Sequence, residues 1–289
     1  MTASGEDDIL SCDAEGELRL WQPHKTDSSL IRSDVNCACF AGSSIVIGTR
    51  SGSWSVLSPS FREEEHLVES TEGAPIDVIY HADGLATLEA GRNREAAGTI
   101  RLWRRRGKLW QQHVSFEVEA DVRSLDFSMT TKRIVCASFG GEVRVFDLDG
   151  RPVHRFAAHP TVIWSVRLSP TGDEILTASR DNSAVLWSLR GRRETEFVGH
   201  LETVSTAVFS PTGDRVATTS TDGTIRLWSL AGETLAVLRG HRGQVWDAAF
   251  STDGKRLTSG AYDRELRTWP LTHEELLRHA RELTAVEIR

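Results

Sequence analysis

Residues 161–189 read TVIWSVRLSPTGDEILTASRDNSAVLWSL, and the same pattern returns as TVSTAVFSPTGDRVATTSTDGTIRLWSL at 203–230 and as QVWDAAFSTDGKRLTSGAYDRELRTWPL at 244–271. Corresponding residues of the three copies are 41 positions apart, including the closing tryptophans Trp187, Trp228 and Trp269. Self-similarity at a fixed period of this length marks a small unit that cannot bury its own apolar face and must stack on copies of itself.

Each copy predicts four short strands separated by turns. In the copy around Trp228 the strands are expected at Val204–Ser210, Arg215–Ser220, Thr224–Leu230 and Thr234–Leu238. Turn sequences with glycine, at 211–213 and 221–223, separate the first three of them. The alternation of side chains along a strand gives each sheet two faces, and both must be covered by neighbouring sheets.

More divergent copies precede these three. They are DDILSCDAEGELRLW (7–21), SIVIGTRSGSWSVL (44–57), LATLEAGRNREAAGTIRLW (85–103) and RIVCASFGGEVRVFDL (133–148). The residues at the tryptophan position are then Trp21, Leu57, Trp103, Phe146, Trp187, Trp228 and Trp269. The chain is therefore predicted to contain seven copies.

These residues resemble the WD40 repeat family, in which a Gly-His or Ala-His pair, an aspartate in a tight turn and a strand ending in tryptophan recur. The resemblance covers nearly the whole chain and is most specific in residues 152–271. It implies an all-β fold, a seven-bladed β-propeller of four-stranded antiparallel sheets over residues 1–271. The family's Trp-Asp pair is altered here, to Trp187-Ser188 and Trp228-Ser229.

The first and last blades are expected to be incomplete. The first copy begins at its second strand, Ile9–Cys12, and would lack the inner strand of blade one. The seventh copy ends at Leu271 after three strands, and residues 272–289 have the apolar spacing of a helical tail. We hypothesise that the two missing strands lie in sequence upstream of Met1. The alternative is that Thr284–Ile288 folds back as the outer strand of blade seven.

A histidine, a serine, an aspartate and a tryptophan recur in the last three copies. Such a set suggests a hydrolase triad, but catalysis has no reason to repeat in each blade, whereas a buried hydrogen-bonded brace does. The resemblance implies the structural interpretation. The expected brace residues are His159, Ser179, Asp181 and Trp187; His200, Ser220, Asp222 and Trp228; and His241, Asp263 and Trp269, with Ala261 in place of the serine. Blades five to seven are therefore predicted to be more rigid than blades one to four.

The resemblance also implies that the starts of the first strands and the second turns of the blades face one end of the propeller, its top. Aromatic and arginine side chains there are typical of interface hot spots. The candidate partner-binding residues are Trp164, Trp246, Tyr262, Arg180, Arg123, Asn36 and Arg50. An alternative reading is that the tryptophans only fill the mouth of the central channel.

Charge and composition exclude several other classes. The formal net charge is −7, and the basic run Arg104–Arg106 is expected in a loop beside the acidic run Glu63–Glu65, so nucleic-acid binding is not expected. No apolar run is long enough to span a membrane. The four cysteines fall in predicted strands and indicate buried thiols in a reducing cytoplasm. No catalytic, metal-binding or cofactor-binding motif is expected.

Two classes of function are consistent with the sequence. The first, which the sequence favours, is a non-catalytic scaffold that binds a protein or peptide on the top face, so the chain is not expected to be an enzyme. In this class the tail EELLRHARELT resembles the segment that follows the propeller in large bacterial proteins joining an NTPase module to WD40 repeats, which would place an enzymatic domain upstream. The second class is a propeller enzyme that acts in the central channel.

Overall fold

The computed structural model describes residues 2–3, 8–22, 28–41, 44–58, 63–68, 73–81, 84–91, 96–107, 109–119, 121–272 and 274. These residues form seven small antiparallel sheets, six of four strands and one of three, which is the fold of a seven-bladed β-propeller. The chain divides into two compact units, Met1–Phe156 and Ala157–Arg289. The predicted fold class is confirmed.

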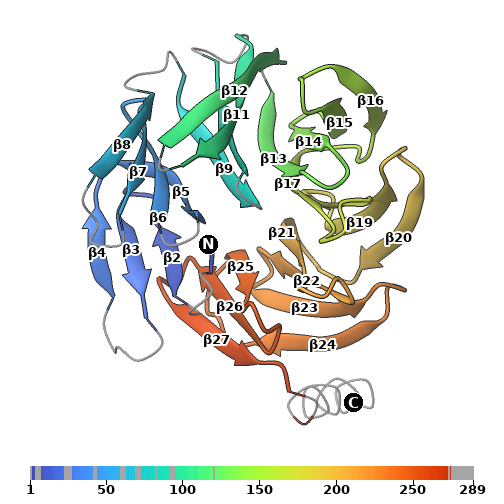
Figure 1. Cartoon of the computed structure of the whole chain (residues 1–289). Helices are drawn as coiled ribbons and strands as arrows, with labels where there is room; N and C mark the ends of the chain where they lie inside the picture. The colour runs from blue at the N-terminus through green and yellow to red at the C-terminus, as the bar shows by residue number, and fades with distance from the viewer. Residues whose placement is uncertain are drawn as a thin grey trace, which may run out of the picture. The chain divides into compact units, whose positions relative to one another are not determined.

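The first unit holds four sheets, coloured blue to green in Figure 1. Sheet 1 contains β1 (Thr2–Ala3), β2 (Ile9–Cys12), β3 (Leu18–Trp21) and β4 (Ser29–Arg32). Sheet 2 contains β5 (Val35–Ala41), β6 (Ser44–Thr49), β7 (Trp54–Leu57) and β8 (Glu63–Val68). Sheet 3 contains β9 (Pro75–His81), β10 (Gly84–Glu89), β11 (Gly98–Arg106) and β12 (Leu109–Val118). Sheet 4 contains β13 (Val122–Ser128), β14 (Arg133–Ser138), β15 (Glu142–Asp147) and β16 (Pro152–Ala157).

The second unit holds three sheets, coloured yellow to red in Figure 1. Sheet 5 contains β17 (Ile163–Leu168), β18 (Glu174–Ser179), β19 (Ser183–Ser188) and β20 (Arg193–Val198). Sheet 6 contains β21 (Val204–Phe209), β22 (Arg215–Ser220), β23 (Thr224–Ser229) and β24 (Thr234–Arg239). Sheet 7 contains β25 (Val245–Phe250), β26 (Arg256–Ala261) and β27 (Leu266–Pro270). The boundaries predicted for the sixth copy are confirmed to within one residue.

Apolar contacts between successive sheets build the core of each unit. In the second unit, Leu176 and Phe197 of sheet 5 pack with Val204 and Trp228 of sheet 6 in one buried cluster. Ile225 of sheet 6 belongs to another cluster that reaches into sheet 7. The central strands are buried along nearly their whole length, as in β6 and β22. Within each unit, successive sheets therefore shelter one another's faces, as the repeat period predicts.

Glycines shape the tight turns between strands. Gly213 follows β21 with φ of 72°, and Gly223 follows β22 with φ of 81°. In this left-handed region a side chain is strained, and glycine is not. The Pro-Thr-Gly and Thr-Asp-Gly sequences therefore fix where the first three strands of sheet 6 reverse.

Sheet 1 requires a correction to the prediction for the first blade. Thr2 and Ala3 form a two-residue strand that pairs with Leu10 and Ile9. The first strand of this blade is therefore short rather than missing. The prediction failed because two paired residues are too few to show an alternating pattern. Sheet 7 has three strands among the described residues. The predicted helical tail (272–289) lies outside the described residues apart from Thr272 and Glu274, and the alternative strand Thr284–Ile288 lies outside them entirely.

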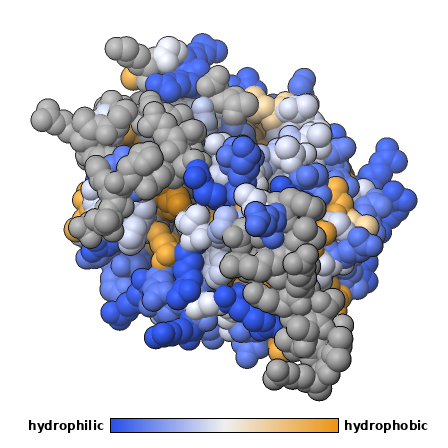
Figure 2. Space-filling view, turned by 90° about the horizontal axis from the view of Figure 1, so that it is seen from below, coloured by the Kyte–Doolittle hydropathy of each residue, from blue (hydrophilic) through white to orange (hydrophobic). Residues whose placement is uncertain are grey.

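Both charge runs lie in strands rather than in the expected loops. Arg104–Arg106 ends β11, and Glu63–Glu65 begins β8. The sheet pairs continue through both runs, so backbone pairing has extended these strands past the predicted turns. Among the residues that Figure 2 colours by hydropathy, most are hydrophilic, and the apolar ones form small separate groups. Within the described part of the chain, no helix has the length and hydropathy needed to cross a membrane.

Candidate functional site

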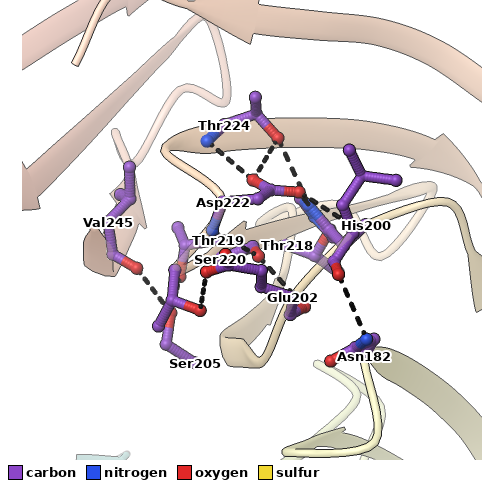
Figure 3. A network of polar contacts seen from close by, with 12 residues as sticks. Asn182, His200, Glu202, Ser205, Thr218, Thr219, Ser220, Asp222, Thr224 and Val245 are labelled. Carbon is purple, nitrogen blue, oxygen red and sulfur yellow. Dashed lines mark hydrogen bonds and ion pairs between the residues drawn. The ribbon is translucent and has the colours of Figure 1, made fainter. Parts of the chain in front are cut away.

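A chain of hydrogen bonds runs through sheet 6 (Figure 3). His200 Nδ1 lies 2.9 Å from Asp222 Oδ2, and His200 Nε2 lies 2.8 Å from Thr218 Oγ1. The Trp228 indole N–H donates to the same Thr218 oxygen over 2.8 Å. A carboxylate can only accept, so Nδ1 carries the proton toward Asp222, and in the neutral ring Nε2 accepts from the threonine hydroxyl. Every polar group of this buried chain then has a partner.

Sheets 5 and 7 repeat the arrangement. His159 contacts Asp181 at 2.8 Å and Thr177 at 2.7 Å, and Trp187 donates to Thr177 over 2.9 Å. In sheet 7 the four corresponding residues are His241, Asp263, Ser259 and Trp269, with contacts of 2.8–2.9 Å.

The hydroxyl in this chain differs from the predicted one. Thr177 and Thr218 join histidine to tryptophan, in place of the expected Ser179 and Ser220. Those serines have another role, since each accepts the backbone N–H of the turn aspartate, Asp181 or Asp222. The hydrogen-bond chain of sheet 7 is also complete, although Ala261 stands where the prediction expected a serine.

The reason lies in strand register. In the hairpin β18–β19, Ile175 is opposite Trp187, so Thr177 is the diagonal neighbour of the indole on the same face. Ser179 lies two residues farther along that face, too far from the indole ring.

The same diagonal hydroxyl bonds a tryptophan in two more sheets. Trp21 donates to Ser11 over 2.8 Å, and Trp103 donates to Thr87 over 3.2 Å. In sheets 2 and 4 the tryptophan is replaced by Leu57 and Phe146, and the diagonal positions hold Ile47 and Cys136. Indole and hydroxyl are therefore present together or absent together across the seven sheets. This pairing was visible in the sequence and was not used in the prediction.

Sheets 3 and 4 contain different buried polar groups. Glu89, which is buried, accepts a hydrogen bond from Trp54 of sheet 2 at 2.8 Å and from Arg101 of its own sheet. In sheet 4 the buried Arg144 donates to Glu142 at 2.8 Å and to Glu119 at 2.7 Å. Hydrogen bonds and ion pairs thus stabilise these sheets in place of the histidine brace of sheets 5 to 7, and they include a contact of 2.9 Å between His81 of sheet 3 and Asp126 of sheet 4.

The braces are not suited to nucleophilic catalysis. The hydroxyls of Thr177, Thr218 and Ser259 belong to fully buried side chains. Burial alone would raise the pKa of the Asp222 carboxyl, but hydrogen bonds from His200 and Thr224 lower it well below its ordinary value. The aspartate is therefore a permanent acceptor at neutral pH. The arrangement holds the turn that contains the aspartate and gives the indole N–H a hydrogen-bond acceptor. It repeats in three sheets.

Three of the predicted partner-binding residues come together in the second unit. Trp164 and Trp246 meet edge to face with ring centroids 6.0 Å apart, and Trp246 meets Tyr262 in the same way at 5.8 Å. The sheet between them carries the small, buried Ser205 at the equivalent position, which leaves room for the two indoles to meet. Trp246 is 36% exposed and Tyr262 64% exposed. We call Trp164, Trp246 and Tyr262 the aromatic cluster.

The other predicted residues are arranged differently. Arg180 in the second unit is exposed and has no hydrogen bond or ion pair from its side chain to a described residue. In the first unit, Arg123 lies over the Phe139 ring at 4.5 Å. Asn36 donates to the Pro75 carbonyl at 3.3 Å, and Arg50 donates to the Ala14 carbonyl. Asn36 and Arg50 therefore tie neighbouring sheets together within their unit.

Among the described residues, no group of three or more His, Cys, Asp or Glu side chains could hold a metal ion. None of the four cysteines is in a disulfide. Burial raises the pKa of the Cys136 thiol to about 12, so this thiol is unreactive at neutral pH.

Comparison with known proteins identifies the repeat. The model of the family described as WD domain, G-beta repeat (WD40) matches residues 109–147, 150–188, 191–229 and 232–270, which together make up more than half of the chain. Each match spans the fourth strand of one sheet and the first three strands of the next. A search of curated proteins returned no match.

The first prediction concerns the hydroxyl of sheet 6. Thr218→Val keeps the shape of the side chain but leaves the buried Trp228 N–H and His200 Nε2 without their partner. We expect the free energy of unfolding to fall by about 3 kcal/mol, as measured by chemical denaturation. Thr234→Val in the same sheet is the control, because Thr234 is exposed, and it should change stability by less than about 0.5 kcal/mol. Equal effects of the two changes would contradict a bracing role for Thr218.

The second prediction concerns the stability of the fold at acidic pH. Burial raises the pKa of the Asp181 carboxyl, but hydrogen bonds from His159 and Ser183 outweigh this effect and lower the pKa to about 2, from an ordinary value of 3.8. Because the folded pKa is the lower one, Asp181 stabilises the fold above pH 4, and this contribution is lost as the pH falls toward 2. It amounts to on the order of 2 kcal/mol.

The measurement is chemical denaturation of the wild type and of Asp181→Asn at pH 5 and pH 2.5. The stability difference between the two proteins should shrink at the lower pH. Asp149→Asn is the control, because Asp149 is an exposed turn residue, and its stability should differ only slightly from that of the wild type at either pH. A wild-type advantage over Asp181→Asn that is the same at both pH values would show that the ionised carboxylate does not stabilise the fold.

Proposed function

Because the chain belongs to the WD40 family, whose propellers are typically non-enzymatic and commonly serve as protein-interaction scaffolds, we propose that it binds a protein or peptide through the aromatic cluster and does not act as an enzyme. The supporting observation is the exposure of Trp246 and Tyr262 in an edge-to-face arrangement. Trp, Tyr and Arg dominate the binding energy of protein interfaces. The fold itself needs neither Trp246 nor Tyr262, since the neighbouring copy has Ser205 and Thr221 at the equivalent positions.

Arg180 is a further contact residue in this proposal. Its side chain is exposed, and its backbone N–H is fixed by a hydrogen bond to the Val162 carbonyl at 2.9 Å, two residues before Trp164. A guanidinium on an ordered turn can bind a carboxylate or carbonyl of the partner with little loss of backbone entropy. Arg123, Asn36 and Arg50 receive less support as contacts, because their side chains already bind other parts of the first unit.

An enzymatic role in the channel has less support. Asp77 and Asp247 are the acidic residues that the sequence offers near the start of a first strand. Asp77 already accepts from Ser124 and from the Leu125 backbone, each at 3.2 Å, and Asp247 accepts from the Ala248 backbone at 2.9 Å. Carboxylates occupied in this way support strand structure rather than general acid or base catalysis.

The proposal includes a reducing, cytoplasmic location, supported by four cysteines outside disulfides. It does not require a membrane or a nucleic acid. It extends to an NTPase-linked domain upstream in the same polypeptide only through the sequence of the tail, which lies outside the described residues apart from Glu274.

The test is quantitative affinity capture. Immobilised wild-type chain and the double variant Trp246→Ala with Tyr262→Ala would be compared in extracts of the cells that make the protein, and the captured proteins measured by mass spectrometry. We expect specific partners to be lost from the variant, because truncating one hot-spot aromatic weakens binding about 30-fold.

Two controls make this test decisive. Circular dichroism and thermal unfolding must show that the double variant is folded. Leu109→Ala removes an exposed apolar side chain, 60% exposed, outside the aromatic cluster and should capture the same proteins as the wild type. If the folded double variant captures the same proteins at the same levels, the aromatic cluster is not the binding surface.

A further inference from the structure

Arginines recur at one position of the third strand, and most of them bind a carboxylate of the chain itself. In three sheets the partner is the glutamate two residues earlier in sequence, at 2.8–2.9 Å: Arg19 with Glu17, Arg144 with Glu142, and Arg267 with Glu265. In sheet 3, Arg101 binds Glu89 instead. The fold therefore supplies a carboxylate to the guanidinium in each of these four sheets.

Arg226 of sheet 6 is the exception among the described arginines at this position. The residue two positions earlier is Thr224, whose hydroxyl donates to Asp222 at 2.6 Å as part of the brace. Arg226 Nε is buried and has no hydrogen-bond partner. The guanidinium lies 5.7 Å from the centre of the Trp228 ring. The sheet thus keeps the arginine and lacks the carboxylate that its sister sheets provide.

Two charges act on Arg226, the negative charge of Asp222 and the positive charge of Arg239. Arg239 is the diagonal neighbour of Arg226 on the same face, because Thr224 is opposite Arg239 and Arg226 is opposite Val237. Burial lowers the pKa of Arg226, Asp222 counteracts this in part, and the charge of Arg239 lowers it further. An anion bound at this pair would relieve both effects, since it would solvate the guanidinium and screen the repulsion.

Two exposed apolar side chains are close in sequence to a residue that contacts Arg226. A Cβ at Gly199 would lie 2.7 Å from Arg226 Nη1, so the guanidinium rests against the backbone of this segment. Val198 is one residue before Gly199 and Leu201 is two residues after it, and they are 65% and 83% exposed. Large apolar side chains with such exposure, next to a half-buried charged group, are typical of a surface that a partner covers.

We propose that Arg226 and Arg239 bind a carboxylate of an acidic partner peptide, and that Val198 and Leu201 contact the apolar residues beside that carboxylate. A carboxylate is the ligand because the sister arginines bind carboxylates in the same strand context. This site is separate from the proposed function, since it uses no residue of the aromatic cluster. Its failure would leave that function untouched.

The experiment follows the arginine Nε–Hε signals of the ¹⁵N-labelled full chain by NMR. The probe is the peptide Ac-Leu-Glu-Leu-NH₂, and its matched control is Ac-Leu-Gln-Leu-NH₂. The Arg226 signal is identified by its absence in Arg226→Lys. We expect a saturable shift of this signal with the glutamate peptide and about tenfold weaker binding of the glutamine peptide, because a charge-assisted hydrogen bond is lost.

A second variant places a carboxylate of the chain itself beside Arg226. Thr224→Glu restores the residue that sheets 4 and 7 carry at this position, and sheet 7 keeps its histidine brace with Glu265 in place. We expect Thr224→Glu to bind the glutamate peptide about tenfold more weakly than the wild type, because the introduced carboxylate would already be paired with Arg226. Arg267→Lys, at an arginine already paired, should leave binding unchanged.

Several results would overturn the proposal. One is the absence of a saturable shift of the Arg226 signal, and another is equal binding of the glutamate and glutamine peptides. The third is an unchanged affinity of folded Thr224→Glu for the glutamate peptide. Tighter saturation by inorganic phosphate than by the glutamate peptide would assign the site to a phosphate instead. If Thr224→Glu does not fold, the comparison of the two peptides and the loss of binding in Arg226→Lys decide the question.

Discussion

A buried indole N–H must find an acceptor, and this requirement organises the sheets of the protein. In the described residues of five sheets the acceptor is a hydroxyl on the second strand, diagonal to the tryptophan across the hairpin. Leaving such a donor unpaired would cost about 1–3 kcal/mol in each sheet. Where the indole is gone, as at Leu57 and Phe146, the hydroxyl is gone as well. The two groups therefore behave as one unit of structure.

The histidine and aspartate extend this pair in the second unit. The hydroxyl that accepts from the indole can donate to histidine, and the histidine can donate to the turn aspartate, so three elements of one sheet are linked. A network with every member satisfied stabilises a unique arrangement, whereas a partly satisfied one would cost stability. In the first unit, ion pairs of Glu89 and Arg144 take this place, and their geometry differs from sheet to sheet. The same fold is thus reached with two kinds of buried polar contact.

Periodicity predicted the sheets well because the spacing of Trp187, Trp228 and Trp269 fixes the length of the unit, and glycines such as Gly213 and Gly223 fix its turns. It could not decide between Thr177 and Ser179, because both side chains lie on the same face of β18 and only the register of the hairpin distinguishes them. The short strand Thr2–Ala3 was missed because two residues show no alternation. The charge runs were placed in loops because their composition is polar, yet backbone pairing continues through both.

The candidate site was predictable in part for a similar reason. Comparing equivalent positions singles out Trp164 and Trp246, since the copy between them has Ser205. Their contact depends on the space that this serine leaves, which requires the three sheets to be side by side. The special position of Arg226 could not be recognised from one copy alone. It emerges only when the glutamates of the sister sheets are seen to bind their arginines.

Amide hydrogen exchange of the full chain tests most directly whether the braces determine local stability. Strands β18 and β22 belong to fully braced sheets, and β6 and β14 belong to sheets without the indole–hydroxyl pair, while all four strands are similarly buried. Hydrophobic burial alone therefore predicts similar protection in all four strands, whereas a bracing role predicts slower exchange in β18 and β22. Equal protection in the four strands, or greater protection in β6 and β14, would contradict the account.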